Sequence, residues 1–259
     1  MFEAINQKMQ SRAEAVLLVL DNRLDRILQA WLLIAGFIAA ARIAFAPVAT
    51  QMPTLSTFAC YLLLIVAPFA STLLALRWFR DGHLLAQPSI RLAVFGQWRA
   101  VELSDAARHP LYGSGGMMVS LLVGMMLNVP VRTAEYLAAM PPVGSGGPAW
   151  LATLHFAMTL DAVLFGSLYM IAFVAALRRV PLFPRLLVAI WTADLLMQLV
   201  TANLAMRGGD LPREVASALH SLLEGNVTKV LISMTLWLPY LLLSTRVNVT
   251  FRHRVPGRS

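Results

Sequence analysis

The chain has 259 residues, of which 58% are hydrophobic and only 13% are charged, and its formal net charge is +8. A soluble domain carries about 25% charged residues, so this composition excludes an ordinary soluble fold and requires lipid to cover much of the surface. The basic residues flank apolar runs instead of alternating with aromatic residues, which indicates an anionic membrane surface and predicts no nucleic-acid partner. The single cysteine, Cys60, excludes an internal disulfide.

The first part of the chain predicts an interfacial segment followed by a helical hairpin. Residues 1–26 mix apolar and charged positions, and we predict an amphipathic cytoplasmic or interfacial helix there. The next two apolar runs predict a two-helix transmembrane hairpin over residues 27–76. Residues 77–110 are basic and predict a cytoplasmic loop, with a surface helix over residues 88–107.

The second part of the chain predicts a four-helix transmembrane unit over residues 111–251 and a basic cytoplasmic tail at 252–259. Each apolar run is long enough to cross the hydrocarbon at about 1.5 Å per residue, and a spanning segment must satisfy its backbone internally as a helix. Residues 210–224 predict a separate short amphipathic helix on the outer face, with Asp210 near its cap. The predicted fold class is therefore all-α: a polytopic membrane protein with six transmembrane helices and short interfacial helices.

The distribution of Lys and Arg predicts the orientation. Sixteen of these residues fall in the N-terminal segment, the second and fourth connections and the tail, whereas the other connections hold only two. Short cytoplasmic loops are enriched in Lys and Arg. We therefore expect both termini in the cytoplasm.

The last apolar run ends in WLPYLLLSTRVNVTF, at residues 237–251. This stretch resembles the closing signature of an uncharacterised family of small four-helix bacterial inner-membrane proteins. Segments RRVPLFPRLLV and LYGSGGMMVSLLVG are similar to a basic turn and a helix start in the same family, so the resemblance covers about residues 110–252. It implies a four-helix unit, a location in a bacterial inner membrane and no known activity. The residues that carry its best part are Trp237, Pro239, Tyr240, Ser244, Arg246, Val247, Thr250 and Phe251.

Two aspartates lie near the middle of predicted spans. Asp161 and Asp194 are each about 11 residues inside consecutive antiparallel helices, which places both roughly 16 Å deep. A charged group at this depth costs at least about 2.5–3.5 kcal/mol. Two interpretations stay open: a proton or cation site in which the pair shares one proton, or carboxyls that hydrogen-bond across helices as a structural element. Gln198 and Thr201 share the helical face of Asp194 and extend a polar seam.

A second polar group is predicted toward the outer side. Asn128 and Arg132 follow one another on one face of the third apolar run, Glu135 lies within pairing distance of Arg132, and Pro130 stands between them. Lys229 is expected on the same side. Such a group either forms a binding site at an interrupted helix or marks the end of a long helix from which Arg132 extends to the interface.

Gly116, Ser120 and Gly124 repeat every four residues and predict a face on which another helix can pack closely. None of the five histidines lies at metal-ligand spacing, so we predict no metal and no cofactor.

Three functional hypotheses remain. The absence of catalytic motifs favours a non-catalytic accessory, assembly or interaction protein, whose partners are the lipid bilayer and either a second copy or another membrane protein. A small proton- or cation-coupled transporter that uses Asp161 and Asp194 is the first alternative. A membrane-embedded lipid-processing enzyme is the second.

Overall fold

The computed structural model describes residues 2–45, 55–90, 92, 96–142, 148–207 and 211–257, with side chains described from residue 11 onward. Its long helices are α1 (Phe2–Asn22), α2 (Leu24–Ala44), α3 (Leu55–Trp78), α5 (Met117–Ala139), α6 (Ala149–Leu177), α7 (Phe183–Arg207) and α8 (Arg213–Leu243). Within the described residues, all of these except α1 are long and apolar enough to cross a membrane, which gives six candidate spans. The prediction of an all-α polytopic membrane protein is confirmed.

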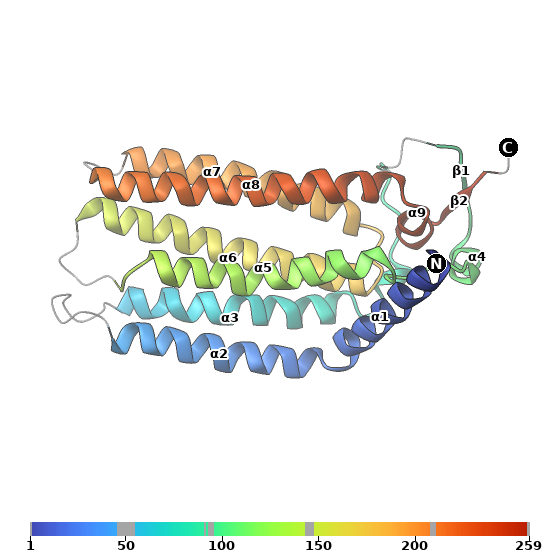
Figure 1. Ribbon diagram of the computed structural model, residues 1–259, viewed down its shortest axis with the longest axis horizontal. Coiled ribbons are helices and arrows are strands. Elements are labelled where there is room, and N and C mark those ends of the chain that lie inside the picture. Colours follow the sequence, from blue (N-terminus) through green and yellow to red (C-terminus); the bar gives the residue numbers. More distant parts are fainter. Residues whose placement is uncertain are drawn as a thin grey trace.

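The six spanning helices form an elongated bundle, with the smaller elements gathered at one end (Figure 1). These elements are α1, a 3-10 turn (Gly82–Leu84), β1 (Trp98–Ala100), α4 (Leu103–Arg108), α9 (Thr245–Arg252) and β2 (Arg254–Pro256). Because the described chain starts and finishes at this end, an even number of crossings lies between its two termini. The basic connections predicted from the sequence lead to the same end.

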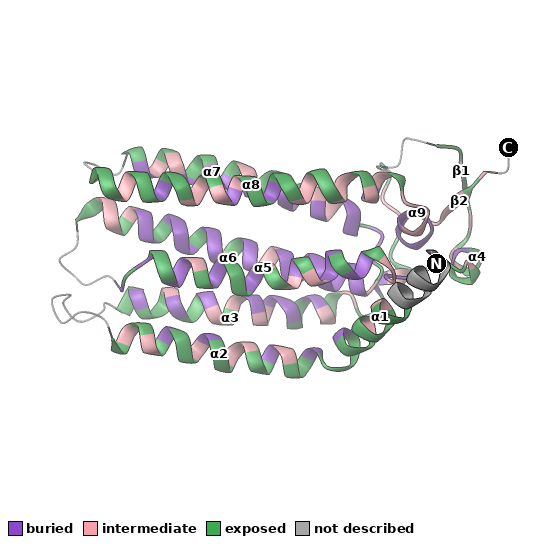
Figure 2. Ribbon diagram, in the orientation of Figure 1, coloured by how far each residue is buried: buried purple, intermediate pink, exposed green. Residues whose placement is uncertain are grey.

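Helix α6 is the centre of the bundle. It packs against α3, α5 and α7, while α2 packs mainly on α3 and α8 on α7. In the apolar windows of these helices, 61% of α6 residues are buried but only 17% of those in α2 and in α8, as the colouring of Figure 2 shows. The peripheral helices α2 and α8 therefore present most of their side chains to lipid.

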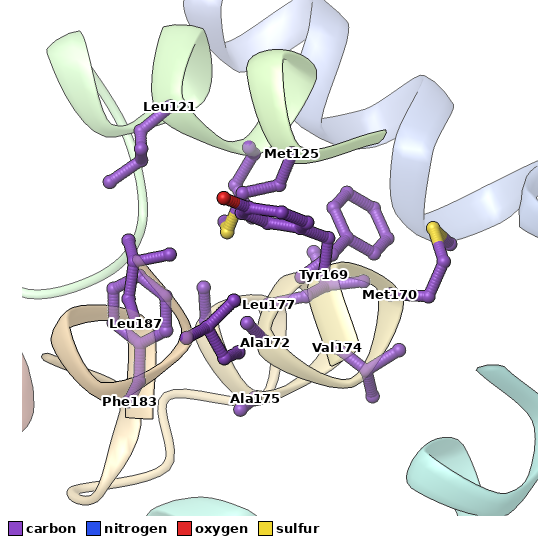
Figure 3. Packing of buried hydrophobic residues seen from close by; sticks show 14 of the residues in the cluster. Leu121, Met125, Tyr169, Met170, Ala172, Val174, Ala175, Leu177, Phe183 and Leu187 are labelled. Carbon is purple, nitrogen blue, oxygen red and sulfur yellow. The ribbon is translucent and has the colours of Figure 1, made fainter. Parts of the chain in front are cut away.

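The core near the small elements is a continuous apolar cluster from α5, α6 and α7. Met125 of α5 lies beside Tyr169 of α6, while Leu121 of α5 points to the side of Leu187 and Phe183 at the start of α7 (Figure 3). Helix contacts inside a membrane depend on close packing because lipid is as apolar as the side chains. This cluster therefore holds the three helices in register around the polar site described below.

The loop before α5 corrects one prediction. The helix expected over residues 88–107 does not form at that length: in the described part of this stretch, helix is confined to α4, and β1 precedes it. Strand β1 pairs antiparallel with β2 of the tail, with Arg99 opposite Val255. This pairing gives backbone groups of both strands hydrogen-bond partners. The two strands lie far apart in the chain, so the local periodicity of the sequence does not predict that they pair.

A second correction concerns residues 210–224. The separate outer helix predicted there is wrong, because α8 runs without a break from Arg213 to Leu243. Pro212 immediately precedes the helix, the rest of this stretch holds no glycine or proline, and the single glycine that follows it is tolerated. Pro239 lies further along α8 and does not end it. Asp210, the expected cap residue, lies outside the described residues.

Helix α9 closes the end of the bundle that carries the small elements. Arg252 is only 4% exposed, and its Nη1 donates to the Leu241 carbonyl (2.8 Å) and to Asn248 Oδ1 (3.2 Å). Burial, together with the positive charges of Arg254 and Arg185, lowers the pKa of the Arg252 guanidinium to about 10. This end of the molecule therefore concentrates positive charge in a partly desolvated place.

Candidate functional site

Three neighbouring helices bring an arginine and two aspartates together inside the bundle. Arg132 of α5 places Nη1 2.6 Å from Asp161 Oδ2 of α6 and Nη2 2.7 Å from Asp194 Oδ2 of α7. All three residues are buried, with exposed fractions of 8%, 4% and 0% respectively. One guanidinium thus connects three helices, and its forked donors address two carboxylates at once.

The remaining carboxylate oxygens also have donors. Gln198, one turn beyond Asp194 on α7, donates from Nε2 to Asp161 Oδ1 (3.0 Å) and Asp194 Oδ1 (3.2 Å). The hydroxyl of Tyr169 donates to Asp194 Oδ2 (3.1 Å), and the face of Phe165 lies 5.2 Å from Arg132 Cζ. The network is therefore closed around both carboxyls, which is how buried charges are tolerated.

A chain of polar groups leads from this network toward the end of the bundle opposite the small elements. Asn226 of α8 donates to Gln198 Oε1 (3.4 Å), Lys229 donates to Asn226 Oδ1 (3.5 Å), and Lys229 also pairs with Glu135. A cavity of about 50 Å³ lies between Arg132, Glu135, Asn226 and Lys229. It has room for a few water molecules and borders Arg132 on this side.

The structure joins two groups of residues that the sequence analysis treated separately. Arg132 does not pair with Glu135 and does not extend to the interface; it points inward to Asp161 and Asp194. Glu135 pairs instead with Lys229. Pro130 lies within an unbroken α5, so the expected helix interruption is absent from this described helix.

Two residues that the sequence predicts as members of the polar sites, Thr201 and Asn128, stay outside the hydrogen-bonded network. Thr201 is 1% exposed, but its hydroxyl has no hydrogen-bond partner within the described part of the chain. Asn128 lines the small cavity, and its Oδ1 is also buried without a partner. The helical face of Asp194 therefore supplies Gln198 to the site, but not Thr201.

In the described part of the chain, Gly116 and Ser120 are bordered across a groove by α1 and by Arg246 of α9. A Cβ at Gly124 would meet nothing within 4 Å, while Gly116 and Ser120 line an open groove beside Arg246. Gly116 has φ +62°, a conformation that favours glycine, and the Arg246 guanidinium lies directly beside it. The predicted packing face is thus available at the surface of α5.

The residues that carry the family resemblance anchor α9. Val247, Thr250 and Phe251 are each 0% exposed; Thr250 Oγ1 accepts from the Gly113 amide (2.9 Å), and the Phe251 ring lies 5.0 Å from that of Phe183.

The other members of this signature lie just before these anchors. Trp237 and Tyr240 form an edge-on aromatic pair in α8 with ring centroids 5.9 Å apart, and Pro239 lies between them without ending the helix. Ser244 precedes α9, and Arg246 donates to the Gly113 carbonyl (3.4 Å). The residues of this stretch therefore hold α9 against the end of the bundle.

The sequence analysis missed a second polar cluster. The Tyr136 hydroxyl lies 2.7 Å from Thr159 Oγ1 and 3.1 Å from His155 Nε2, and the Tyr61 ring of α3 packs edge-on against Tyr136. His155 and Thr159 are one turn apart on α6, a spacing that was visible in the sequence. Their partners, Tyr61 on α3 and Tyr136 on α5, could not be recognised in the sequence, because a lone tyrosine in an apolar run does not indicate a polar contact.

The charges at the site do not balance. Two carboxylates face one guanidinium, so the buried cluster carries a net charge of −1 unless one carboxyl holds a proton. A buried net charge is costly in a medium of low dielectric constant. Among the described residues, no group of three or more His, Cys, Asp or Glu side chains could hold a metal ion. The arrangement can thus fasten three helices and can hold one proton.

Comparison with family models, with curated proteins and with solved structures found no match for this chain.

Proposed function

We propose that this chain is a non-catalytic accessory or assembly protein of a bacterial inner membrane, with both termini in the cytoplasm. It holds another membrane protein, or a second copy of itself, against its lipid-facing surface. The observation that carries this proposal is the closed network around Arg132, in which the carboxylates at membrane depth are occupied by donors from the chain itself. A resemblance of residues 237–251 to small uncharacterised membrane proteins is part of the same proposal.

The closed network argues for a structural role. Arg132 and Gln198 each contact both aspartates, and the cavity beside them measures only about 50 Å³. Removing one partner from a buried ion pair typically costs 3–5 kcal/mol. The charged residues therefore contribute most to the molecule by fixing α5, α6 and α7 as one rigid body, which is what a scaffold requires.

The surface of α8 supports an interaction role. An apolar hollow of about 510 Å³ surrounds Pro239 and is lined by Leu231, Met234, Leu238 and Leu242. Helices associate in a membrane by fitting surfaces closely together. A hollow on a helix that is only 17% buried offers such a surface to a neighbouring helix.

The experiment is photo-crosslinking at native expression. A photoreactive residue is placed at Leu236 or Leu243 of α8, which are 59% and 56% exposed, and at Leu33 or Phe37 of α2 as matched lipid-facing controls. We expect a discrete protein adduct from α8 and only lipid adducts from α2. An adduct of twice the chain mass identifies a second copy, and another mass identifies a different partner. If neither helix gives a protein adduct and the purified chain is monomeric, the proposal fails.

A proton-dependent role is the second candidate, and the net charge of the cluster is the observation that favours it. Asp161→Asn and Asp194→Asn test it, with Gln198→Glu as a variant that adds a negative charge instead. If Asn variants are folded and abundant but the host loses the function of the chain, the proton-coupled alternative replaces the scaffold proposal. If function follows stability in every variant, the scaffold proposal holds. The described residues add no support for the lipid-processing alternative.

A further inference from the structure

A groove of about 730 Å³ opens beside α5 at the end of the bundle that carries the small elements. One wall comes from α1 with Arg12 and Val16, another from α5 with Gly116 and Ser120, and Arg246 of α9 lies at its end. This volume falls in the range of sites for small organic ligands, about 300–1,000 Å³. The groove is separate from the buried network around Arg132, with which it shares no residue.

One end of the groove is cationic and rich in hydroxyl groups. Arg12 and Arg246 both line it, and neither forms an ion pair with any carboxylate whose side chain the structure describes. Arg246 is held in place by the Gly113 carbonyl (3.4 Å). Ser244 and Thr245 line the same end. Two guanidinium groups, one of them held by Gly113, lie beside hydroxyls and the positive end of the α5 dipole and are suited to a phosphate group.

The other end of the groove is apolar and follows a spanning helix. Val119 and Val123 continue the wall along α5, and the small residues Gly116 and Ser120 leave space beside the helix. Beyond the groove, Gly124 on the same face has no neighbour within 4 Å of a Cβ position. A hydrocarbon chain laid along this face displaces no side chain at Gly124.

We propose that this groove binds an anionic phospholipid of the surrounding bilayer, with the phosphate between Arg12 and Arg246 and an acyl chain along Val119, Ser120 and Val123. The combination of a cationic end and an apolar wall matches the two parts of a phospholipid. It also lies at the basic end of the molecule, where the charge distribution predicts the anionic leaflet. A soluble phosphate compound would use only the cationic end.

The test is native mass spectrometry of the purified full-length protein in mild detergent. Phosphatidylglycerol and phosphatidylcholine with identical acyl chains are titrated separately, and the retained lipid is counted. We expect phosphatidylglycerol to bind at least tenfold more tightly than phosphatidylcholine. The double variant Arg12→Gln/Arg246→Gln should lose about 30-fold in affinity for phosphatidylglycerol, because each basic residue near a membrane surface contributes about 1 kcal/mol to binding anionic lipid.

The matched control is Arg23→Gln/Arg26→Gln. It makes the same change in charge, and both arginines are exposed and lie outside the groove. Ser120→Phe tests the apolar wall without changing charge; because Ser120 is exposed, this variant should fold, and we expect it to weaken binding of both lipids. The thermal midpoint of each variant in phosphatidylcholine confirms that it is folded.

Three outcomes would overturn the proposal. The first is equal retention of the two lipids by the unmodified protein. The second is an equal loss of phosphatidylglycerol in the Arg12/Arg246 and Arg23/Arg26 double variants. The third is complete displacement of phosphatidylglycerol by millimolar inorganic phosphate, which would mean that the acyl wall contributes nothing.

Discussion

At the scale of single residues, Arg132 determines the character of the membrane interior of this protein. It is the one cation that the structure places against Asp161 and Asp194 in the described part of the bundle, and it contacts both at hydrogen-bond distance. Because two negative groups depend on one positive group, the three residues are not equivalent. Loss of the arginine leaves two carboxylates unpaired, whereas loss of one carboxylate leaves a neutral pair.

This inequality predicts a large difference between substitutions at the three positions. Arg132→Met should lower the free energy of unfolding by about 3–5 kcal/mol, the usual cost of an uncompensated buried charge. Asp161→Asn should change it by less than about 1 kcal/mol, because the amide keeps one hydrogen-bond acceptor for Arg132 and removes the excess charge. Chemical denaturation in a defined detergent measures both. Similar losses for the two variants would contradict the net charge assigned to the cluster.

Arg252 carries a second prediction at this scale. Its pKa is lowered to about 10 by burial and by the charges of Arg254 and Arg185, so the charged form is destabilised in the folded protein. Near pH 7 Arg252 is charged in both the folded and the unfolded chain, and its unfavourable interactions are fully present; they would be relieved only as the pH rises through 10. Arg185→Gln should therefore raise stability at pH 7.

The gain expected from Arg185→Gln is up to about 1 kcal/mol, the size of an interaction between partly exposed charges. The measurement is the thermal midpoint at pH 7, which should rise by about 2–4 °C for a chain of this size. Arg185→Lys keeps the charge and serves as the control. A lower midpoint for the glutamine variant would show that Arg185 has a favourable partner that outweighs the repulsion.

At the scale of elements, α9 closes the bundle through a few fully buried side chains. Phe251 is 0% exposed and packs against Phe183, which begins α7. Thr250 connects α9 to Gly113 in the segment before α5. The tail continues into β2, which pairs with β1. These contacts therefore link α9 and β2, although both are short, to the start of α7 and to the segment before α5.

Phe251→Ala should release α9 from α7. Removing a buried phenylalanine ring usually costs about 3–5 kcal/mol, and this loss should fall first on α9 and β2, because the ring packs against Phe183 at the start of α7. Limited proteolysis should then cut the tail near Arg252 and Arg254 faster, while the spanning helices stay intact. Leu243→Ala, at a lipid-facing position that is 56% exposed, is the control. Equal cleavage rates in the two variants would argue against this role for Phe251.

At the scale of the whole molecule, the basic residues lie at the same end of the bundle as the small elements. The small elements, the groove with Arg12 and Arg246, and the basic connections all lie at one end of the bundle. The opposite end, where α5 ends and α8 begins, has few basic residues by comparison. The positive-inside rule then predicts that the first end faces the cytoplasm.

Cysteine labelling tests this orientation. Cys60→Ser removes the single native cysteine, and new cysteines are introduced at Asp105, which is exposed beside α9, and at Ser217, which is exposed near the start of α8. In intact cells a membrane-impermeant maleimide should label Ser217→Cys, and Asp105→Cys should react only after lysis. The reverse pattern would mean that the protein is inserted in the opposite orientation.

The sequence by itself determined the membrane class, the six spans and the even number of crossings. These properties depend on the length and apolarity of continuous runs, which are local. It also predicted Asp161 and Asp194 as two carboxyls at similar depth, since depth follows from counting residues along a helix. The polar seam predicted on the face of Asp194 included Gln198 and Thr201, but the Thr201 hydroxyl has no hydrogen-bond partner among the described residues. The interfacial pieces were less accurate: the helix over residues 88–107 is replaced by β1 and α4, and the separate helix at 210–224 is part of α8.

Only the tertiary structure decided which groups meet. On sequence spacing, Arg132 pairs with Glu135 one turn away, but the packing of α5 against α6 and the approach of α7 direct its guanidinium to Asp161 and Asp194 and leave Glu135 to Lys229. Likewise, in the described residues the face with Gly116 and Ser120 lines a groove bordered by α1 and Arg246. The rotation of each helix about its axis is fixed by contacts between distant segments. Because spacing along one helix does not contain that information, the partners of a polar residue could not be read from the sequence.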